Sequence, residues 1–392
     1  MEVATVSDSI PQEAQAEDAA GRWSIVFLVS GALLPAMLDL AYFAQKSGLK
    51  TLMIVLERQE LTLKPDRALV NYDMITVNVP YTAVEFRRFT SMLSVYRKLK
   101  TIIIEGLEPN GTIITSSYDL LMMSRLIALG RKYRLKHQVR DLHPLQLSKS
   151  FLSYCFVLIE RLLLKRVEQV LVSSPEFANQ YYRNIFHGKT VLLENMPARQ
   201  TWAGFKKDRT DPGCFRIGYI GIIRYKESLK QLIAAVQILA REGRRIKVVF
   251  AGGGRFDDLL EVIGDKTLFE FQGAYEYSKD IKRLYSNIDL NYSVYDSHNL
   301  NCQLAMPNKF YESIISEIPI LVASNTFLEK EVLRLGIGAS VLSGDVDGLV
   351  DLLRKAIDNK DWYATALKRL QACDANDYFD AYDKALEESI LG

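Results

Sequence analysis

The sequence predicts an α/β protein of two domains, each a parallel sheet wound on both faces by helices. The chain has 392 residues, and 48% of them are apolar, which is enough for two substantial cores. From residue 23 onward, short apolar runs alternate with amphipathic segments of helical length. A polar stretch rich in turn formers, 195–213, interrupts this alternation. These observations indicate two Rossmann-like, doubly wound domains in tandem.

The first half of the chain supplies one set of alternating elements. We expect strands at 23–31, 49–57, 74–79, 112–117, 136–141 and 169–174. We expect helices at 35–47, 118–132 and 148–166, and one more after Ser174 and Pro175, because a capping hydroxyl followed by proline is typical of a first turn. Residues 85–107 fit either a strand over "TIIIEGL" or a long helix that runs into a turn at 108–111, and their periodicity favours the helix.

The second half supplies a similar set. Its expected strands are 215–221, 246–254, 268–273, 288–295 and 318–324, and its expected helices are 228–241, 255–263, 278–286 and 307–317, with a loop before the last helix. The segment 361–391 is amphipathic and helical, and it is long enough to cross back over both domains. The expected organisation is therefore a disordered tail at 1–21, a first domain at 22–200, a linker at 201–213, a second domain at 214–360 and C-terminal helices at 361–392.

Charge and cysteine content exclude several classes of function. The net charge is only +2, with both signs interspersed, so no bulk field for nucleic acid is present. The four cysteines lie far apart, with no C-x-x-C pair and no histidine at ligand spacing. We therefore expect a reduced cytosolic protein without a metal site or a cofactor. The acidic first residues do not resemble a signal peptide, and no apolar run reaches the roughly 18 residues of a membrane span.

A lysine and a glutamate stand one turn apart where the expected helix at 307–317 begins. Pro307 suits a first helical turn, and the free amides near Asn308 attract an anion. Lys309 adds a full positive charge there, and Glu312 follows on the same face. A carboxylate beside a cation suits a ligand with a phosphate and a vicinal diol, as in nucleotide diphosphates. The alternative is a Lys309–Glu312 ion pair on a solvated face.

Two further segments lie at expected strand ends in the second domain. In "GYIGIIRYKES" the cations Arg224 and Lys226 follow a strand end and could neutralise a pyrophosphate; the alternative is an ordinary soluble loop. In "FAGGG" the glycines Gly252, Gly253 and Gly254 permit close backbone approach or a positive φ. This run does not have the spacing of the dinucleotide fingerprint.

The first domain also has candidate residues at strand ends. Arg140, Asp141 and His143 follow an expected strand, where cleft residues belong. Asp141 could act as a general base towards an acceptor hydroxyl. Alternatively, Arg140 and Asp141 form a structural salt bridge or cap the next helix. Gly31 ends the first strand, where a glycine would let an acceptor or a phosphate approach.

The expected helix at 148–166 is apolar on nearly every face, with Lys149, Lys165 and Arg166 at its ends. Such a segment is usually a buried core helix. It could instead lie in a bilayer interface, with its basic ends on anionic head groups.

Taken in order, these segments resemble the two-Rossmann (GT-B) glycosyltransferases of group 1, which are family 4-like, and above all the bacterial enzymes that build capsule and exopolysaccharide. The resemblance covers nearly the whole chain from about Trp23. It includes "HQVRDLHP", "VLVSSPEF", "LLENMP", "GYIGIIRYKESL", "FAGGG" and "MPNKFYESIISEIPILVAS". It implies that Arg224 and Lys309 bind the donor pyrophosphate and that Glu312 binds the donor ribose. It also implies an acceptor in the first domain and catalysis between the domains.

The sequence departs from this family at one position. Many retaining members carry a second glutamate eight residues before the ribose-binding one, and here that residue is Leu304. Polar residues of the preceding stretch could contact the sugar instead: Asp296, His298, Asn299 and Asn301. Because the paired glutamate is missing while Asp141 stands at a strand end, we expect an inverting transfer with Asp141 as the base.

We therefore expect a metal-independent hexosyltransferase that uses a nucleotide diphosphate sugar, with UDP as the expected nucleotide. The expected acceptor is a glycan or a lipid-linked glycan of a bacterial surface polysaccharide, reached from the cytoplasm with peripheral contact to the inner face of the membrane. A nucleotide-sugar 2-epimerase of the same fold and a catalytically silent donor-binding subunit are the alternatives.

Overall fold

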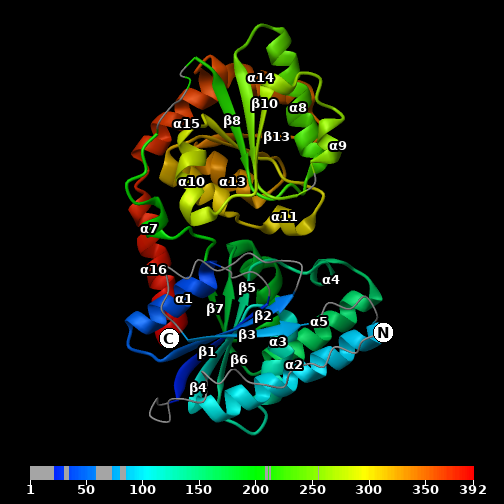
Figure 1. Cartoon of the computed structure of the whole chain (residues 1–392), viewed down its shortest axis with the longest axis vertical. Coiled ribbons are helices and arrows are strands. Elements are labelled where there is room, and N and C mark those ends of the chain that lie inside the picture. The colour runs from blue at the N-terminus through cyan, green and yellow to red at the C-terminus, as the bar shows by residue number, and fades with distance from the viewer. Residues whose placement is uncertain are drawn as a thin grey trace, which may run out of the picture.

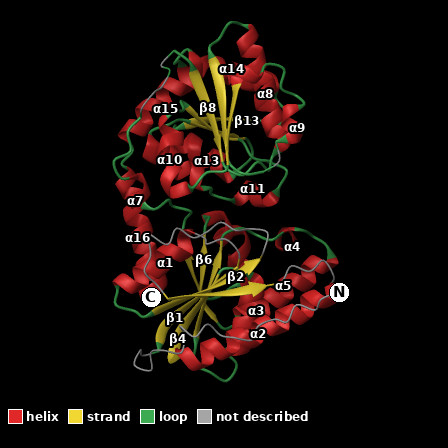
Figure 2. Ribbon diagram, viewed as in Figure 1, coloured by secondary structure: helices red, strands yellow, loops and turns green. Residues whose placement is uncertain are grey.

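The computed structural model describes residues 22–30, 35–58, 73–79, 85–207, 211, 213–254 and 256–392. The expected tail at 1–21 and Gly31 lie outside these residues. Figure 1 shows two α/β lobes, one above the other, with the last two helices of the chain along one side. Figure 2 shows that each lobe has a central sheet covered by helices, as the sequence predicts.

The first domain is built on a seven-stranded sheet in the order β3-β2-β1-β4-β5-β6-β7. Every pair of neighbouring strands is parallel. The strands are β1 (Trp23–Ser30), β2 (Thr51–Arg58), β3 (Asp73–Val79), β4 (Leu107–Thr115), β5 (Arg134–Val139), β6 (Val167–Val172) and β7 (Lys189–Leu192). The helices are α1 (Pro35–Lys46), α2 (Glu85–Gly106), α3 (Tyr118–Ile127), α4 (Pro144–Leu147), α5 (Phe151–Leu164), the π-helix η2 (Phe177–Tyr182) and α6 (Arg183–Ile185).

The second domain has a six-stranded sheet in the order β10-β9-β8-β11-β12-β13. Its strands are β8 (Phe215–Ile220), β9 (Ile246–Ala251), β10 (Phe269–Gly273), β11 (Leu290–Ser293), β12 (Ile320–Ala323) and β13 (Gly338–Val341). The remaining helices are α7 (Arg199–Trp202), α8 (Lys226–Arg241), α9 (Asp257–Leu260), the 3-10 turn η3 (Lys266–Leu268), α10 (Tyr277–Ser286), α11 (Leu300–Leu304), α12 (Asn308–Ser316), α13 (Phe327–Leu335), α14 (Val346–Ile357), α15 (Asp361–Ala372) and α16 (Ala375–Leu391). In both sheets the strand order reverses after the first three strands, which opens a crevice at the carboxyl ends of the strands.

Burial on both faces explains why the strands appear in the sequence as continuous apolar runs. In β1, Val26 and Leu28 belong to one core, while Phe27 and Val29 belong to the core on the opposite face. Side chains alternate between the faces of a strand, and helices cover both faces here, so the buried positions 25–29 are all apolar. The side chains on both faces of β1 are therefore shielded from solvent in the middle of the strand.

Several expected elements differ from the structure. The preference for a helix over 85–107 is confirmed by α2, but no turn follows it, because β4 begins at Leu107 and absorbs the next residues in a register shift against β1. Helix α3 ends at Ile127 rather than at residue 132. The expected loop at 295–309 contains α11, which forms because the Asn299 side chain accepts hydrogen bonds from the backbone N–H groups of Asn301 and Cys302.

Helix α5 is not the buried core helix that its composition favours. Its buried residues are only Ser153, Glu160 and Leu164. Phe151 and Leu152 at its start are 79% and 68% exposed. An apolar composition on every face does not show which face the rest of the fold leaves open, and here the outer face is open. None of the described helices combines the length and apolar character that crossing a bilayer requires.

Helix α16 crosses back onto the first domain, as expected. It packs against α1 and β7, and Figure 1 shows it in red beside the lower lobe. Tyr382 on α16 donates a hydrogen bond of 3.0 Å to Asp39 of α1. Lys136 of β5 is completely buried and donates a hydrogen bond of 2.6 Å to the carbonyl of Ser389. Burial, with the nearby charges of Arg134 and Lys189, lowers the pKa of Lys136 to about 8. The last helix thus fastens the second domain to the first.

Candidate active site

A cavity of about 310 Å³ lies where the two domains face each other. On the second-domain side it is lined at the ends of three neighbouring strands, by Ile220 of β8, Ser293 of β11 and Ala323 of β12. Arg140 and Asn195 line it from the first domain. It therefore occupies the crevice at the switch point of the second sheet, where open α/β sheets bind ligands.

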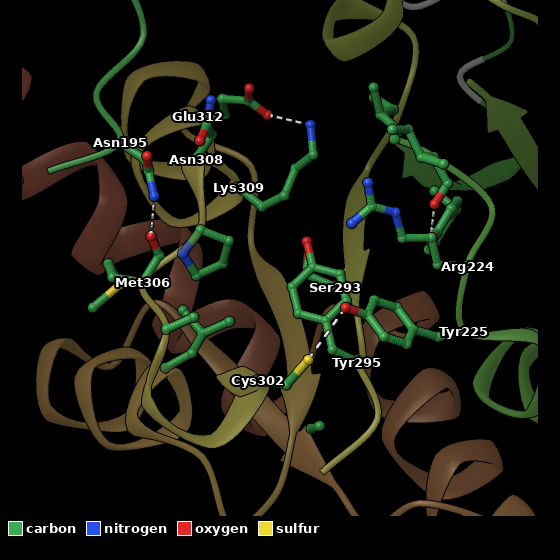
Figure 3. Close-up of a pocket in the computed structure, with 18 of the residues that line it drawn as sticks. Asn195, Arg224, Tyr225, Ser293, Tyr295, Cys302, Met306, Asn308, Lys309 and Glu312 are labelled. Carbon is green, nitrogen blue, oxygen red and sulfur yellow. Dashed lines mark hydrogen bonds and ion pairs between the residues drawn. The ribbon is translucent and has the colours of Figure 1, made fainter. Parts of the chain in front are cut away.

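Lys309 and Glu312 form an ion pair at the start of α12, on the cavity wall. The distance from Lys309 Nζ to Glu312 Oε2 is 2.7 Å, and Figure 3 shows the contact. The Glu312 side chain is completely buried and that of Lys309 is 12% exposed. The alternative interpretation of the sequence, an ion pair, is correct about the contact, but the pair lies in a buried wall rather than on a solvated face. Asn308 and Pro307 line the cavity beside it.

Two tyrosine hydroxyls complete the surroundings of the Glu312 carboxylate. Tyr277 donates to Oε1 at 2.8 Å, and Tyr285 donates to Oε2 at 2.6 Å. Burial and then the negative charge of Glu312 raise the pKa of both tyrosines well above the ordinary value. Both phenols therefore keep their protons and act as donors to the carboxylate.

Lys309 keeps its charge in this setting. Burial by itself would lower its pKa, but the Glu312 carboxylate and Tyr275 act in the opposite direction, and the pKa ends above the ordinary lysine value. A charged ammonium at a helix N-terminus, beside free backbone amides, attracts an anion.

Arg224 supplies a second positive charge on the same cavity. It lies on the loop between β8 and α8, and it is exposed. Figure 3 shows the guanidinium of Arg224 and the ammonium of Lys309 extending towards the same space. Within the described part of the chain, no ion pair is recorded for Arg224. Lys226 is the first residue of α8 and does not line the cavity.

The glycine run after β9 supports this loop and does not line the cavity. Gly252 has φ of +146°, and a Cβ atom there would lie 1.9 Å from the carbonyl oxygen of Gly221. A Cβ atom at Gly254 would lie 2.8 Å from the Cβ atom of Ile223. The close approach that the sequence predicts is therefore made to the backbone of the loop that carries Arg224. Gly253 has nothing within 4 Å of its Cβ position.

Asp141 and Asn301 meet across the gap between the domains, and both line the cavity. The side-chain amide of Asn301 donates to Asp141 Oδ1 at 2.9 Å and accepts from the backbone N–H of Leu142 at 2.8 Å. Among the described residues, no ion pair joins Arg140 to Asp141. The helix cap falls to His143, whose Nδ1 accepts from Leu145 N–H at 3.2 Å.

The two candidate histidines are not part of the cavity wall. His143 is exposed, begins α4 and stacks on Phe156 with ring centroids 5.3 Å apart. His298 is exposed, and its backbone N–H donates to Asp296 at 2.9 Å. In the described residues, no group of three or more His, Cys, Asp or Glu side chains could hold a metal ion.

Aromatic and thiol groups of the wall were missed by the sequence reasoning. The hydroxyl of Tyr225 lies 3.2 Å from the sulfur of Cys302, and the rings of Tyr225 and Tyr295 are 5.2 Å apart. Asn195 of the first domain donates to the carbonyl of Met306 at 3.0 Å. The signal available in the sequence was the high tyrosine content, 20 residues, several of them near expected strand ends.

The chain has two parallel-sheet domains with a cavity between them, and comparisons with known proteins show which proteins it resembles. Residues 201–376 match the model of the family described as glycosyl transferases group 1. The succinoglycan biosynthesis protein ExoL of Rhizobium meliloti is 24% identical over 289 residues, which cover 69% of this chain and 70% of that protein.

Solved structures show the same fold. HepE of Anabaena, in complex with UDP and glucose, matches with a TM-score of 0.68 at 15% identity, over 94% of this chain and all of that chain. WaaG, a glycosyltransferase involved in lipopolysaccharide biosynthesis, matches with a TM-score of 0.63 at 13% identity, over 94% of this chain and all of that one. Residues 201–376 thus match the family of group 1 glycosyl transferases, and the whole chain has the GT-B fold of the solved glycosyltransferases.

The two neighbouring glycines provide a matched test of the loop. Gly252→Ala places a methyl group against the carbonyl of Gly221 and strains a positive φ, so we expect it to lower the free energy of unfolding by at least about 2 kcal/mol. Gly253→Ala meets open space and should leave stability within about 0.5 kcal/mol of the parent. Urea denaturation of the two variants checks this. Equal stability of the two would show that the loop does not depend on this contact.

Proposed function

We propose that the chain transfers a sugar from a UDP-sugar to a glycan or lipid-linked glycan in the synthesis of a bacterial surface polysaccharide. The observation that carries the proposal is the buried Lys309–Glu312 pair on a cavity that Arg224 also faces. A similar fold holds UDP-glucose in Anabaena HepE, and the relative ExoL is named for succinoglycan biosynthesis.

The diphosphate would bind between the two cations. Arg224 can make a forked contact with phosphate oxygens, whereas Lys309 acts as a point charge. The N-terminal amides of α12, near Asn308, add partial positive charge from the helix dipole. These groups would stabilise the diphosphate as it leaves, so the proposal needs no metal.

The sugar and the acceptor would meet on the side of the cavity that faces the first domain. In the inverting reaction, Asp141 takes the proton of the acceptor hydroxyl while its oxygen forms a bond to the anomeric carbon. The bond from that carbon to the diphosphate oxygen breaks, and UDP leaves with the electron pair. Arg140 and Asn301 line the same side and would orient the hydroxyl groups.

The exposed face of α5 would contact the cytoplasmic surface of the membrane. It continues onto the neighbouring helix α3, where Leu126 is 48% exposed, and onto the turn after α3, where Leu129 is 54% exposed. Lys149 stands before α5 and Lys165 and Arg166 stand after it, and all three are exposed. An apolar strip with basic ends fits a bilayer of anionic lipids, which is where a lipid-linked acceptor resides.

Charge removal tests the donor site. We expect Lys309→Ala and Arg224→Ala each to weaken UDP binding by about 1 to 3 kcal/mol, the range of charge-assisted contacts. Lys368→Ala, which removes an exposed lysine of α15, is the charge-matched control and should bind UDP normally. Isothermal titration calorimetry measures the affinities, and melting temperatures exclude unfolding. Unchanged UDP affinity in both variants would remove the proposed diphosphate site.

Asp141→Asn tests the proposed base. The amide keeps an acceptor oxygen for Asn301, so the contact between domains can persist. Turnover should fall at least about a hundredfold while UDP-sugar affinity and melting temperature stay nearly constant. NMR of the product determines its anomeric configuration. A product that preserves the configuration of the donor would contradict the inverting reaction.

Vesicle binding tests the face of α5. The double variant Phe151→Ser, Leu152→Ser removes two of its most exposed apolar side chains and should weaken binding to phosphatidylglycerol vesicles by about tenfold. Leu333→Ser, at a 52% exposed leucine of α13, is the matched control. Co-sedimentation measures both. If the parent and the double variant bound the vesicles equally well, the membrane contact would lie elsewhere on the chain.

A further inference from the structure

The Glu312 carboxylate has almost no acceptor position left for a ligand. A carboxylate offers about four positions, two on each oxygen. Tyr285 and Lys309 both donate to Oε2, and Tyr277 donates to Oε1. A ribose diol that places one hydroxyl on each oxygen needs a position on both, and Oε2 is full. One of its two donors has to leave before a diol can bind.

Lys309 is the donor that can leave. Tyr285 is completely buried, packs edge-on against Trp202 with ring centroids 5.2 Å apart, and accepts a hydrogen bond of 3.2 Å from Asn291. Lys309 has a flexible stem, lines the cavity and carries a charge that a diphosphate attracts. Figure 3 shows the side chain of Lys309 lying along the cavity wall, with its ammonium group turned towards Glu312.

We propose that Lys309 occupies the place on Glu312 that the ribose diol of the donor takes, and that the donor diphosphate draws the ammonium away as the ribose binds. This rests on the proposed donor site and adds a mechanism to it. In the ligand-free chain the ion pair compensates the buried carboxylate. In the complex the ribose hydroxyls compensate it, and the ammonium pairs with phosphate.

The exchange makes the two halves of the nucleotide bind cooperatively. A nucleoside without phosphate has to break the ion pair and offers the ammonium nothing in return. Inorganic pyrophosphate draws the ammonium away and leaves the buried carboxylate without its cation, which is unfavourable. Only the nucleoside and pyrophosphate together compensate both Glu312 and Lys309. Each ligand therefore raises the affinity of the chain for the other ligand, and by the same factor.

Tyr277 and Tyr285 are positioning residues in this exchange. Each holds one oxygen of Glu312 from the side of α10. When Lys309 leaves, these two phenols keep the carboxylate hydrogen-bonded and fix the direction of its remaining lone pairs towards the cavity. Neither needs to touch the donor.

A coupling titration tests the exchange. Uridine is titrated into the full chain by calorimetry, without and with saturating inorganic pyrophosphate. We expect pyrophosphate to raise the uridine affinity about tenfold. The same titration with 2′,3′-dideoxyuridine, which lacks the diol, should show no gain. In Lys309→Met the gain should fall below about twofold. Arg224→Met is the matched control. It should weaken the binding of pyrophosphate, but once pyrophosphate is saturating, the gain in uridine affinity should persist.

The outcomes separate this proposal from the donor site itself. Suppose that UDP binds, but that uridine binds equally well with and without pyrophosphate, or binds in neither condition. The proposed exchange is then wrong, and the proposed donor site is unaffected. If UDP itself does not bind, the donor site is wrong.

Tyr277→Phe gives a second readout that needs no weak ligand. It should weaken the binding of UDP about threefold to tenfold and leave the binding of 2′,3′-dideoxy-UDP unchanged, because only the diol contacts Glu312. An equal loss for the two nucleotides would assign Tyr277 a merely structural part.

Discussion

A charge that is removed from water has to be compensated where it stands, and Glu312 is the point at which this constraint organises the second domain. Its carboxylate is completely buried and draws donors from two helices, Lys309 on α12 and two tyrosines on α10. Asn291 of β11 joins the same network through Tyr285 and the carbonyl of Lys309. The start of α12, the side of α10 and the end of β11 are therefore fixed relative to one another, and the cavity lies beside the point where they meet.

Contacts between the domains complete the site from the other side. Asn301 of α11 binds Asp141 and Leu142, and Asn195 binds the carbonyl of Met306, so the segment that precedes α12 is attached to the first domain. Helix α16 fastens the same two domains further away. The residues proposed for the donor and for the base thus belong to different domains. A change in the relative position of the two domains would therefore change the distance between the base and the donor.

The sequence predicted those features that depend on local pattern. Strand β1 is a run of residues buried on both faces, and the spacing of Lys309 and Glu312 places them on one side of a helix whatever surrounds it. Features that depend on distant parts of the chain were not predictable. Tyr277 contacts Glu312 from 35 residues away, and nothing in its own neighbourhood indicates this. Gly252 and Gly254 pack against a neighbouring loop, and the outer face of α5 is exposed; neither was predicted, because composition does not show what packs against a segment.

We propose that this cavity holds the diphosphate of a donor nucleotide on one member of the Lys309–Glu312 ion pair and the ribose on the other. A crystal structure of the chain with UDP tests it most directly. We expect the diphosphate in contact with Lys309 and Arg224, and the two ribose hydroxyls on the two oxygens of Glu312, with the Lys309–Glu312 contact of 2.7 Å broken. A nucleotide bound in this cavity with that contact intact and its ribose directed elsewhere, or bound outside the cavity altogether, would contradict it.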